Sequence, residues 1–370
     1  MKVITIGLDR SLFEKNSDTR DRISQYGPMV REIHIIVFSP KGFKKDKIGD
    51  NIWLYPTNSS SKFFYITDAI KVGRKLMREK KIDLITGQDP FLSGLSAYVL
   101  AGKKRAKLLI GVYGTNIYDK YWLKESFKHR IFKIIGHYIF KRADAIQPDG
   151  LEASEELRKH YGDKVFWKPM IPSNIEEFKV EKRFNKDKFK VLFIGRLVKQ
   201  KNLPALLNII KAIIKDKKKG EIEFTIIGQG PFEDYFKDEI IKRELSDFIK
   251  MIPRVERAEI VSYFKDADIF ILSSIYEGFP RVFMEAAAIG LPMVVTRVSG
   301  IGNLIKNKEN SFVIEQGDEA GFVDAVNRLY SDSALLKQMS EKLKKNFWEN
   351  YNFDITLNKQ REIYNYLKKL

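Results

Sequence analysis

Residues 269–301 read IFILSSIYEGFPRVFMEAAAIGLPMVVTRVSGI, and this stretch decides the fold. It opens with a bare apolar run at residues 269–272, which is typical of a buried strand. Pro280 is favoured in the first turn of a helix and Gly290 suits a helix end, so we expect a helix over residues 280–289. A second apolar run follows the helix. The order is therefore strand, loop, helix, strand.

The start of this helix, from Phe279 to Arg281, has no acidic side chain. Free backbone N–H groups and the positive end of the helix dipole therefore face whatever lies beyond the carboxyl end of the strand. We expect an anion there, and phosphate is the anion that best suits such a site. Glu277 before the helix and Glu285 within it flank this point, where they can hydrogen-bond two hydroxyl-bearing parts of one ligand.

Glu277 and Glu285 stand with seven residues between them inside EGFPRVFMEA. This pattern resembles the donor-binding signature of retaining glycosyltransferases of family 4, within glycosyl transferases group 1. The preceding strand, the Gly-Phe-Pro turn, the helix of small residues and the following Gly-Leu-Pro fall where that family has them. The alternative is that both glutamates face solvent. The resemblance implies an α/β protein of the GT-B fold, with two Rossmann-like doubly wound domains that face each other across a cleft.

Composition excludes several classes of protein. The chain has 370 residues, enough for two domains, and 44% of them are hydrophobic, which excludes a disordered polymer. It has no cysteine, and its four histidines lack metal-ligand spacing, so we predict no metal site. No run approaches the roughly 18 apolar residues of a membrane span, and the opening MKVITIGL is too short for a signal peptide. We therefore expect a soluble, cytoplasmic protein.

The net charge of +18 implies attraction to a polyanion, whether nucleic acid, an acidic membrane surface or an anionic substrate. One basic segment begins at Lys120 and ends at Arg142, with seven Lys and Arg opposed only by Glu125 and with six aromatic residues between them. It is long enough for a helix of about six turns. We predict that this helix lies on an anionic membrane, at the inner face of the cell membrane. The alternative is that its apolar face packs on the sheet and its cations are solvated.

The first half of the chain alternates short apolar runs with helical patterns. We expect strands at residues 2–7, 33–38, 83–86, 107–113 and 143–147, helices near 18 and at 67–81, 90–100 and 152–160, and a basic loop at 40–51. This alternation favours a parallel sheet with helices on both faces, in which ligands bind beyond the carboxyl ends of the strands. The loops at residues 7–13, 88–91 and 114–119 are therefore the expected acceptor side.

Four residues in or beside these loops are candidate acceptor-side or sugar contacts. Relatives often carry a His-Gly-x-Asp motif after the fourth expected strand, and here Tyr113 and Asn116 stand instead. Asp9 and Asp119 are possible helpers in taking up the acceptor's proton. The alternative is that all four are ordinary turn residues.

A domain boundary is expected near residues 170–187, where two prolines precede a dense run of charge. We predict an acceptor-binding Rossmann-like domain at residues 1–172 and a donor-binding Rossmann-like domain at 173–350. The resemblance implies that residues 351–370 form a helix that crosses back to the first domain.

The second domain opens with a strand at residues 190–194 that leads to Gly195. Arg196 and Lys201 follow on one loop, where two cations are well placed to neutralise a diphosphate. The resemblance gives both residues this same role, makes Gly228 part of the nucleotide site and makes the backbone of Arg254 and Val255 the partner of the base. Further strands are expected at residues 223–227, 293–298 and 310–314 and ending at 252, with helices from 203, after 257 and over 318–370.

The predicted catalytic residues are Glu277, Arg196 and Lys201. The predicted donor-binding residues are Glu285, Gly278, Phe279, Pro280, Arg281, Gly195, Arg254, Val255 and Gly228. The resemblance implies that a hexose-type sugar passes from a UDP- or GDP-linked donor to a glycan or lipid-linked acceptor, with retention and without cofactor or metal. The alternatives are a GT-B relative such as a sugar-nucleotide epimerase or a phosphorylase, and a basic nucleic-acid-binding module, for which no motif is present. The sequence does not indicate the sugar, the base, the acceptor or the linkage.

Overall fold

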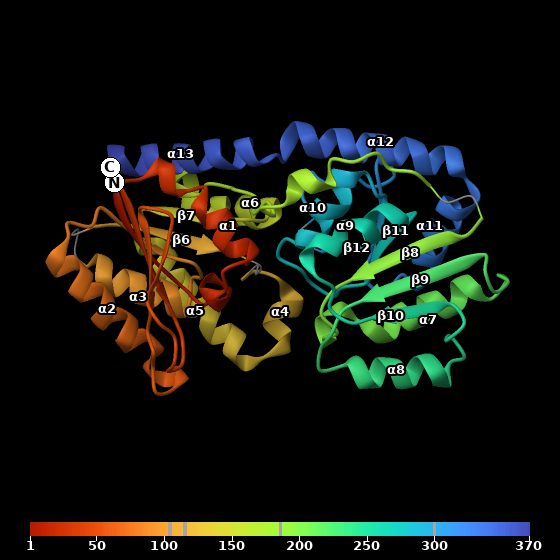
Figure 1. The fold of residues 1–370 in the computed structure, drawn as a ribbon, viewed down its shortest axis with the longest axis horizontal. Coiled ribbons are helices and arrows are strands. Elements are labelled where there is room, and N and C mark those ends of the chain that lie inside the picture. The colour runs from red at the N-terminus through yellow and green to blue at the C-terminus, as the bar shows by residue number, and fades with distance from the viewer. Residues whose placement is uncertain (103–105, 114–116, 185–186, 299–300) are drawn as a thin grey trace. The chain divides into compact units, whose positions relative to one another are not determined.

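The computed structural model of the chain describes residues 1–102, 106–113, 117–184, 187–298 and 301–370 (Figure 1). These residues form two compact units. Unit 1 comprises Met1–Ser173 together with Phe353–Leu370, and unit 2 comprises Asn174–Asn352. The last helix of the chain, α13 (Phe353–Lys369), therefore belongs to unit 1.

Unit 1 is built on a seven-stranded sheet with the order β3-β4-β2-β1-β5-β6-β7. Its strands are β1 (Lys2–Gly7), β2 (Glu32–Val37), β3 (Asp46–Ile48), β4 (Ile52–Pro56), β5 (Leu84–Gly87), β6 (Lys107–Val112) and β7 (Ala145–Pro148). All neighbouring strands run parallel except β3 and β4. Without β3, this order is that of a doubly wound Rossmann sheet, whose switch point lies between β1 and β5.

Helices cover both faces of the unit 1 sheet (Figure 1). They are α1 (Asp18–Ser24), α2 (Tyr65–Glu79), α3 (Leu92–Ala101), α4 (Lys120–Glu125), α5 (Phe127–Arg142), α6 (Leu151–Tyr161) and α13. α13 packs Ile363 and Leu367 into a core made by Val3, Ile35 and other apolar strand residues. α2, α3 and α5 pack together, and α3 also packs on β1, β5 and β6. Strands buried on both faces explain the continuous apolar runs in the sequence.

Two expectations for unit 1 are wrong. The predicted single helix over residues 120–142 is two helices, because Ser126 is extended, with φ −153° and ψ 142°, and its hydroxyl caps α5 at the Lys128 N–H. The predicted basic loop at residues 40–51 contains β3, which pairs with β4. A three-residue edge strand with two charged residues has no apolar pattern that the sequence could reveal.

Unit 2 contains a six-stranded sheet with the order β10-β9-β8-β11-β12-β13. Its strands are β8 (Phe189–Ile194), β9 (Ile222–Ile227), β10 (Ile249–Ile252), β11 (Ile269–Leu272), β12 (Met293–Thr296) and β13 (Phe312–Ile314). All neighbours run parallel, so this is a second Rossmann order, with its switch point between β8 and β11.

The helices of unit 2 form two groups. They are α7 (Leu203–Ile214), α8 (Glu233–Lys242), α9 (Arg257–Asp266), α10 (Arg281–Ile289), α11 (Glu319–Ser331) and α12 (Ser333–Asn350). α7 packs with α8 and α11, whereas α10 packs with α9 and α12. α12 is fastened to α10 by Trp348, which donates to the carbonyl of Ala288, and by Ser340, which donates to that of Gly290. The helical stretch predicted over residues 318–370 is thus three separate helices.

Candidate functional site

Two loops meet in unit 2 at the carboxyl ends of neighbouring strands, β8 and β11. The backbone N–H of Ile275 donates to the carbonyl of Gln200 at 2.8 Å, and the hydroxyl of Ser273 donates to the carbonyl of Lys201 at 2.9 Å. Because β8 and β11 flank the switch point of the sheet, these loops lie where doubly wound folds bind their ligands. The functional residues predicted at the two positions are therefore brought together.

A buried ion pair joins the two loops. Lys201 Nζ lies 2.5 Å from Glu277 Oε1, and each residue is only 9% exposed. The hydroxyl of Ser274 donates to the same carboxylate oxygen at 2.7 Å, and Gln200 Nε2 lies 3.3 Å from the other oxygen. A buried charge is tolerated when it is paired and hydrogen-bonded, and both conditions are met here. The sequence predicted that Lys201 and Glu277 contact different parts of a ligand, whereas the structure pairs them directly.

Arg196 lies on the same loop as Lys201 in a different environment. Its side chain is exposed and has no ion pair or hydrogen bond with any residue that the structure describes. The guanidinium is therefore available to a ligand.

Gly195 and Gly228 allow the loops after β8 and β9 to touch. A Cβ atom on Gly228 would lie 1.9 Å from the carbonyl oxygen of Gly195, which no side chain can tolerate. Gly228 thus lies against the loop that holds Arg196, and its predicted role near the nucleotide stays a prediction.

The N-terminus of α10 completes this group. Pro280 is the N-cap, one position before the first turn in which it was expected, and no side chain caps the helix. The first turn has no acidic residue, and both Phe279 and Pro280 are buried. Uncapped N–H groups at a helix start form a site for an anion such as phosphate. Gly278 adjoins this helix start, and Glu285 is half-buried within the helix.

Comparison with known proteins shows which family model and which relatives match the chain. Residues 174–346 match the family model described as glycosyl transferases group 1. This match places a group 1 glycosyltransferase domain in unit 2 of the chain. An uncharacterized glycosyltransferase of Methanocaldococcus jannaschii is 24% identical over 301 residues, which cover 81% of this chain and 80% of the relative.

Two further proteins resemble this glycosyltransferase. One is the UDP-Gal:alpha-D-GlcNAc-diphosphoundecaprenol alpha-1,3-galactosyltransferase of Escherichia coli, 27% identical over 179 residues, or 48% of this chain and 46% of the relative. The other is the solved structure of sucrose-phosphate synthase from Thermosynechococcus elongatus. It has a TM-score of 0.81 at 14% identity and covers 100% of this chain and 99% of its own. The predicted α/β fold of GT-B type, with two Rossmann-like domains, is confirmed.

Several residues of the glycosyltransferase's site were not predicted from the sequence. Gln316 Nε2 lies 2.9 Å, 3.1 Å and 3.0 Å from the carbonyl oxygens of Ser274, Ile275 and Arg297. The hydroxyl of Thr296 donates to the same carbonyl of Ser274 at 2.6 Å. Gln316 therefore holds the chain just before Glu277. Gln200 and Ser274 adjoin predicted residues, which is a signal that could have revealed them, but no local pattern points to Gln316.

The predicted acceptor-side aspartates of unit 1 are helix caps. Asp9 accepts hydrogen bonds from the backbone and hydroxyl of Ser11 and from the hydroxyl of Thr19. Asp119 accepts from the backbone N–H groups of Tyr121 and Trp122 at the start of α4. These contacts are those of turn and capping residues, the alternative left open by the sequence.

The remaining predicted residues are Tyr113, Asn116, Arg254 and Val255. Tyr113 follows β6, and its hydroxyl accepts a hydrogen bond from Gln147 Nε2 at 2.6 Å. Asn116 lies outside the described residues. Arg254 is exposed and Val255 half-buried in the loop after β10.

The described part of the chain has neither a metal-binding cluster nor a membrane-spanning helix. It holds no group of three or more His, Cys, Asp or Glu side chains arranged to bind a metal ion. Within the same ranges, every helix is too short or too polar to cross a bilayer.

Proposed function

We propose that this glycosyltransferase moves a hexose from a UDP- or GDP-sugar to a glycan or lipid-linked acceptor, with retention of anomeric configuration. The observation that supports the donor class best is the buried Lys201–Glu277 pair beside the uncapped N-terminus of α10, with exposed Arg196 on the same loop. The relative from Escherichia coli bears the name of a transferase for UDP-galactose and a diphosphoundecaprenol-linked acceptor, which supports the same donor and acceptor classes.

The proposed chemistry follows from charge. When a sugar leaves its nucleotide, negative charge grows on the diphosphate and positive charge on the anomeric carbon. Fixed positive groups aimed at the diphosphate stabilise this transition state. Arg196 and the N–H groups at the start of α10, where no side chain caps the helix, are the positive groups proposed to face it. The positive charge thus comes from the chain's own groups, and the proposal requires neither metal nor cofactor.

Lys201 and Glu277 have linked roles in this proposal. The ammonium of Lys201 has three hydrogens, so it can keep its bond to Glu277 and still donate to a phosphate oxygen. Glu277 Oε2 then accepts a hydrogen bond from a sugar hydroxyl, while Glu285 holds the ribose. The ion pair fixes both groups before the donor binds, so little reorganisation is needed during the reaction.

The acceptor's proton passes to an oxygen of the leaving phosphate. Asp9 and Asp119, which cap helices, have no part in this transfer as we now propose it. The retaining mechanism predicts that the new linkage has the anomeric configuration of the donor. NMR of the anomeric proton of the product measures this configuration. An inverted product would contradict the retaining mechanism while leaving the donor site intact.

We also propose that α5 attaches the enzyme to an anionic membrane. α5 buries Gly136, Ile139 and Phe140, so one face packs within unit 1. Four large apolar side chains still remain exposed on α5: Phe127 at 73%, Ile131 at 44%, Ile134 at 70% and Tyr138 at 45%. Their spacing of four, three and four residues places them in one stripe, here called the α5 stripe.

Cations flank the α5 stripe. Lys128, Arg130, Lys141 and Arg142 are all exposed. An exposed apolar stripe bordered by cations is the pattern of a helix that lies in the surface of an anionic bilayer. This observation favours the membrane over the alternative in which the cations are merely solvated, because the packed face of α5 does not use the stripe.

A thermal-shift screen tests the donor class. A ligand that binds the folded state alone raises the melting temperature, by an amount that grows with its concentration. UDP- and GDP-sugars should be compared with an ADP-sugar and with the free nucleosides. Stabilisation by a UDP- or GDP-sugar is expected, and stabilisation by none of the nucleotide sugars in a folded sample would contradict the proposal.

A further inference from the structure

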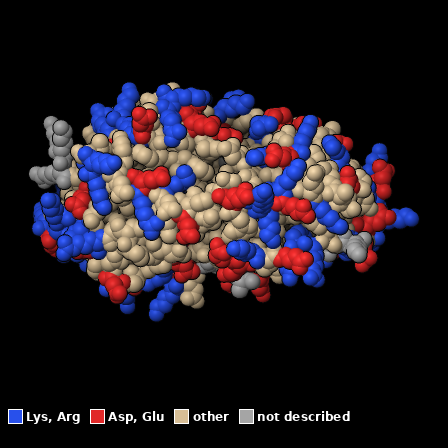
Figure 2. Space-filling model, turned by 90° about the horizontal axis from the view of Figure 1, so that it is seen from above, with Lys and Arg blue, Asp and Glu red and all other residues tan. Residues whose placement is uncertain are grey.

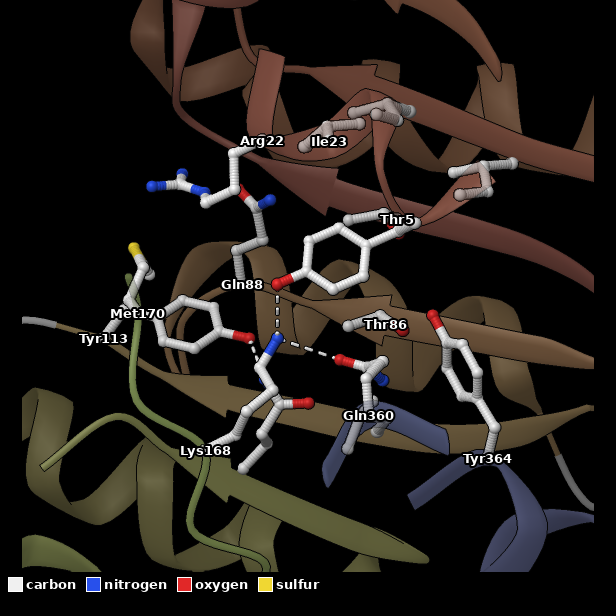
Figure 3. Close-up of a pocket in the computed structure, with 15 residues that line it drawn as sticks. Thr5, Arg22, Ile23, Thr86, Gln88, Tyr113, Lys168, Met170, Gln360 and Tyr364 are labelled. Carbon is white, nitrogen blue, oxygen red and sulfur yellow. Dashed lines mark hydrogen bonds between the residues drawn. The ribbon is translucent and has the colours of Figure 1, made fainter. Parts of the chain in front are cut away.

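Unit 1 contains a polar cavity on the face of its sheet that α1 and α13 cover (Figure 3). Its volume is about 110 Å³, counted as space open to the centre of a water molecule. A single water needs only roughly 10–15 Å³ on this measure, so the cavity holds a group of several atoms. Arg22 of α1 and Tyr26, which follows α1, line it and are half-buried, so the cavity reaches the surface beside α1.

A buried cation without an acidic partner faces this cavity. Lys168 is 7% exposed, and its ammonium donates to the hydroxyl of Tyr26 at 3.2 Å and to Gln360 Oε1 at 2.9 Å, as the dashed lines in Figure 3 show. Both acceptors are neutral, and no Asp or Glu lines the cavity. Burial of a charge is costly unless an opposite charge accompanies it. The charge of Lys168 thus has no opposite charge among the residues that line the cavity.

Hydrogen-bond donors surround the same space. Figure 3 shows Tyr113 after β6, Lys168 in a loop and Gln360 of α13 reaching toward one another. The hydroxyl of Tyr113 accepts from Gln147, which leaves its own proton free to donate. Burial raises the pKa values of Tyr113 and Tyr364, so both hydroxyls stay protonated at neutral pH. The lining therefore offers donors on several sides.

Two glycines make room for these side chains. A Cβ on Gly111 of β6 would lie 2.6 Å from the ring of Tyr113, and one on Gly7 of β1 would lie 1.9 Å from Gln88 Oε1. Tyr113 and Gln88, which both line the cavity, thus fold back over strand ends that lack a side chain. The two glycines thus allow the polar side chains of Tyr113 and Gln88 to reach the cavity.

Strand residues line the cavity from one face of the unit 1 sheet. Thr5 of β1 and Thr86 of β5 are among them, and these two strands flank the switch point of the sheet.

We infer that this pocket binds a phosphate group and, on the basis of the proposed function, that this phosphate belongs to the acceptor. A lysine is a point charge suited to phosphate. The four oxygens of a phosphate point in four directions and can use donors on several sides, whereas a carboxylate presents its two oxygens in one plane. The acceptor class is then a phosphate-bearing glycan or lipid.

The binding of inorganic phosphate tests the pocket itself. Melting temperatures are measured with and without millimolar phosphate at constant ionic strength, for the wild type and for Lys168→Met. Phosphate should stabilise the wild type more than Lys168→Met, whose remaining response is that of the anion site in unit 2, and Lys168→Met should melt no lower than the wild type when phosphate is absent. An equal phosphate response in the two proteins, or none in the wild type, would overturn the inference.

Two more variants keep this test decisive. Arg196→Gln removes a cation of the proposed donor site and should keep the part of the phosphate response that depends on Lys168. Tyr26→Phe keeps its ring beside Lys168 but loses the hydroxyl, and should bind phosphate about tenfold more weakly. If Lys168→Met fails to fold, an undiminished response in Tyr26→Phe would itself contradict the pocket.

Glycerol 3-phosphate and acetate separate the sources of the anion. A phosphate pocket for an acceptor should bind glycerol 3-phosphate with the same dependence on Lys168 and should ignore acetate. If only free phosphate binds, the acceptor assignment fails. A nucleotide sugar should still stabilise Lys168→Met. If no nucleotide sugar stabilised the wild type, that result would contradict the proposed function but not the phosphate pocket.

Discussion

Arg196 and Lys201 share one loop, but they differ in what surrounds them. Arg196 is exposed and free of side-chain partners among the described residues, whereas Lys201 is buried against Glu277. A residue that acts only on a ligand and one that also supports the fold give different results on substitution, so the two can be told apart.

Arg196→Ala should slow turnover by roughly a hundredfold or more, because it removes one fixed charge that faces the leaving diphosphate. Its melting temperature should stay that of the wild type, since the side chain has no partner to lose. Initial rates and a thermal melt measure both effects. Lys199→Ala, on the same loop and also exposed, is the matched control and should leave turnover unchanged.

Lys201→Met should lose stability as well as activity. Removal of one partner leaves the carboxylate of Glu277 buried and unpaired, which costs about 3–5 kcal/mol in the free energy of unfolding. The double variant Lys201→Met with Glu277→Leu should regain much of that loss while remaining inactive, because it buries no charge. Denaturant titration gives the values, and wild-type stability in Lys201→Met would contradict the buried pair.

The sequence predicted Lys201 and Glu277 as site residues, but it did not predict that they contact each other. Lys201 and Glu277 were predictable from their residue types and their positions in loops, because cations and acids beside a helix start suggest a diphosphate site. Their direct contact depends on β8 lying next to β11, which is a matter of strand order in three dimensions. Gln316, which holds the chain before Glu277, was missed for the same reason.

At the scale of elements, apolar runs predicted most strands and helices of both units. The failures have local causes. Ser126 adopts an extended conformation and caps α5. A single serine within a basic helical pattern does not predict this break. β3 is stabilised by its pairing with β4 rather than by its own apolar residues.

The α5 stripe provides a prediction of its own. Ile134→Glu places a charge in the stripe and should weaken binding to anionic vesicles, since it opposes both burial and surface potential. Ile241→Glu on α8 is the matched control, because Ile241 is 69% exposed and Ile134 is 70% exposed. Co-sedimentation with vesicles measures the difference, and equal binding of the two variants would contradict attachment through α5.

The contact between the loops after β8 and β9 can be tested through Gly228. Gly228→Ala forces the carbonyl of Gly195 away and should displace Arg196, so affinity for the donor should fall. Gly220→Ala is the control: Gly220 has φ +96° and no atom within reach of a Cβ, so it adds backbone strain without moving the site. Calorimetric titration of both variants with the donor measures the effect, and equal affinities would contradict this role of Gly228.

At the scale of the whole molecule, the net charge of +18 is spread rather than gathered. On the face seen in Figure 2, Lys and Arg alternate with Asp and Glu. Binding to DNA should therefore be weak and should disappear as salt is raised, because only released counterions support it. Binding to anionic vesicles should persist to higher salt, because the apolar stripe adds a contribution that salt does not screen. Parallel salt titrations compare the two, and tight DNA binding at physiological salt would favour the nucleic-acid alternative.

The most direct test of the central claim is calorimetric titration of the enzyme with UDP- and GDP-sugars. We predict that one nucleotide sugar binds the wild type in unit 2 and that Arg196→Ala weakens this binding at least about tenfold, as expected for a lost charge-assisted hydrogen bond. Absence of binding by every nucleotide sugar, or equal binding by the two proteins, would contradict the claim that Arg196, Lys201 and the start of α10 hold the diphosphate.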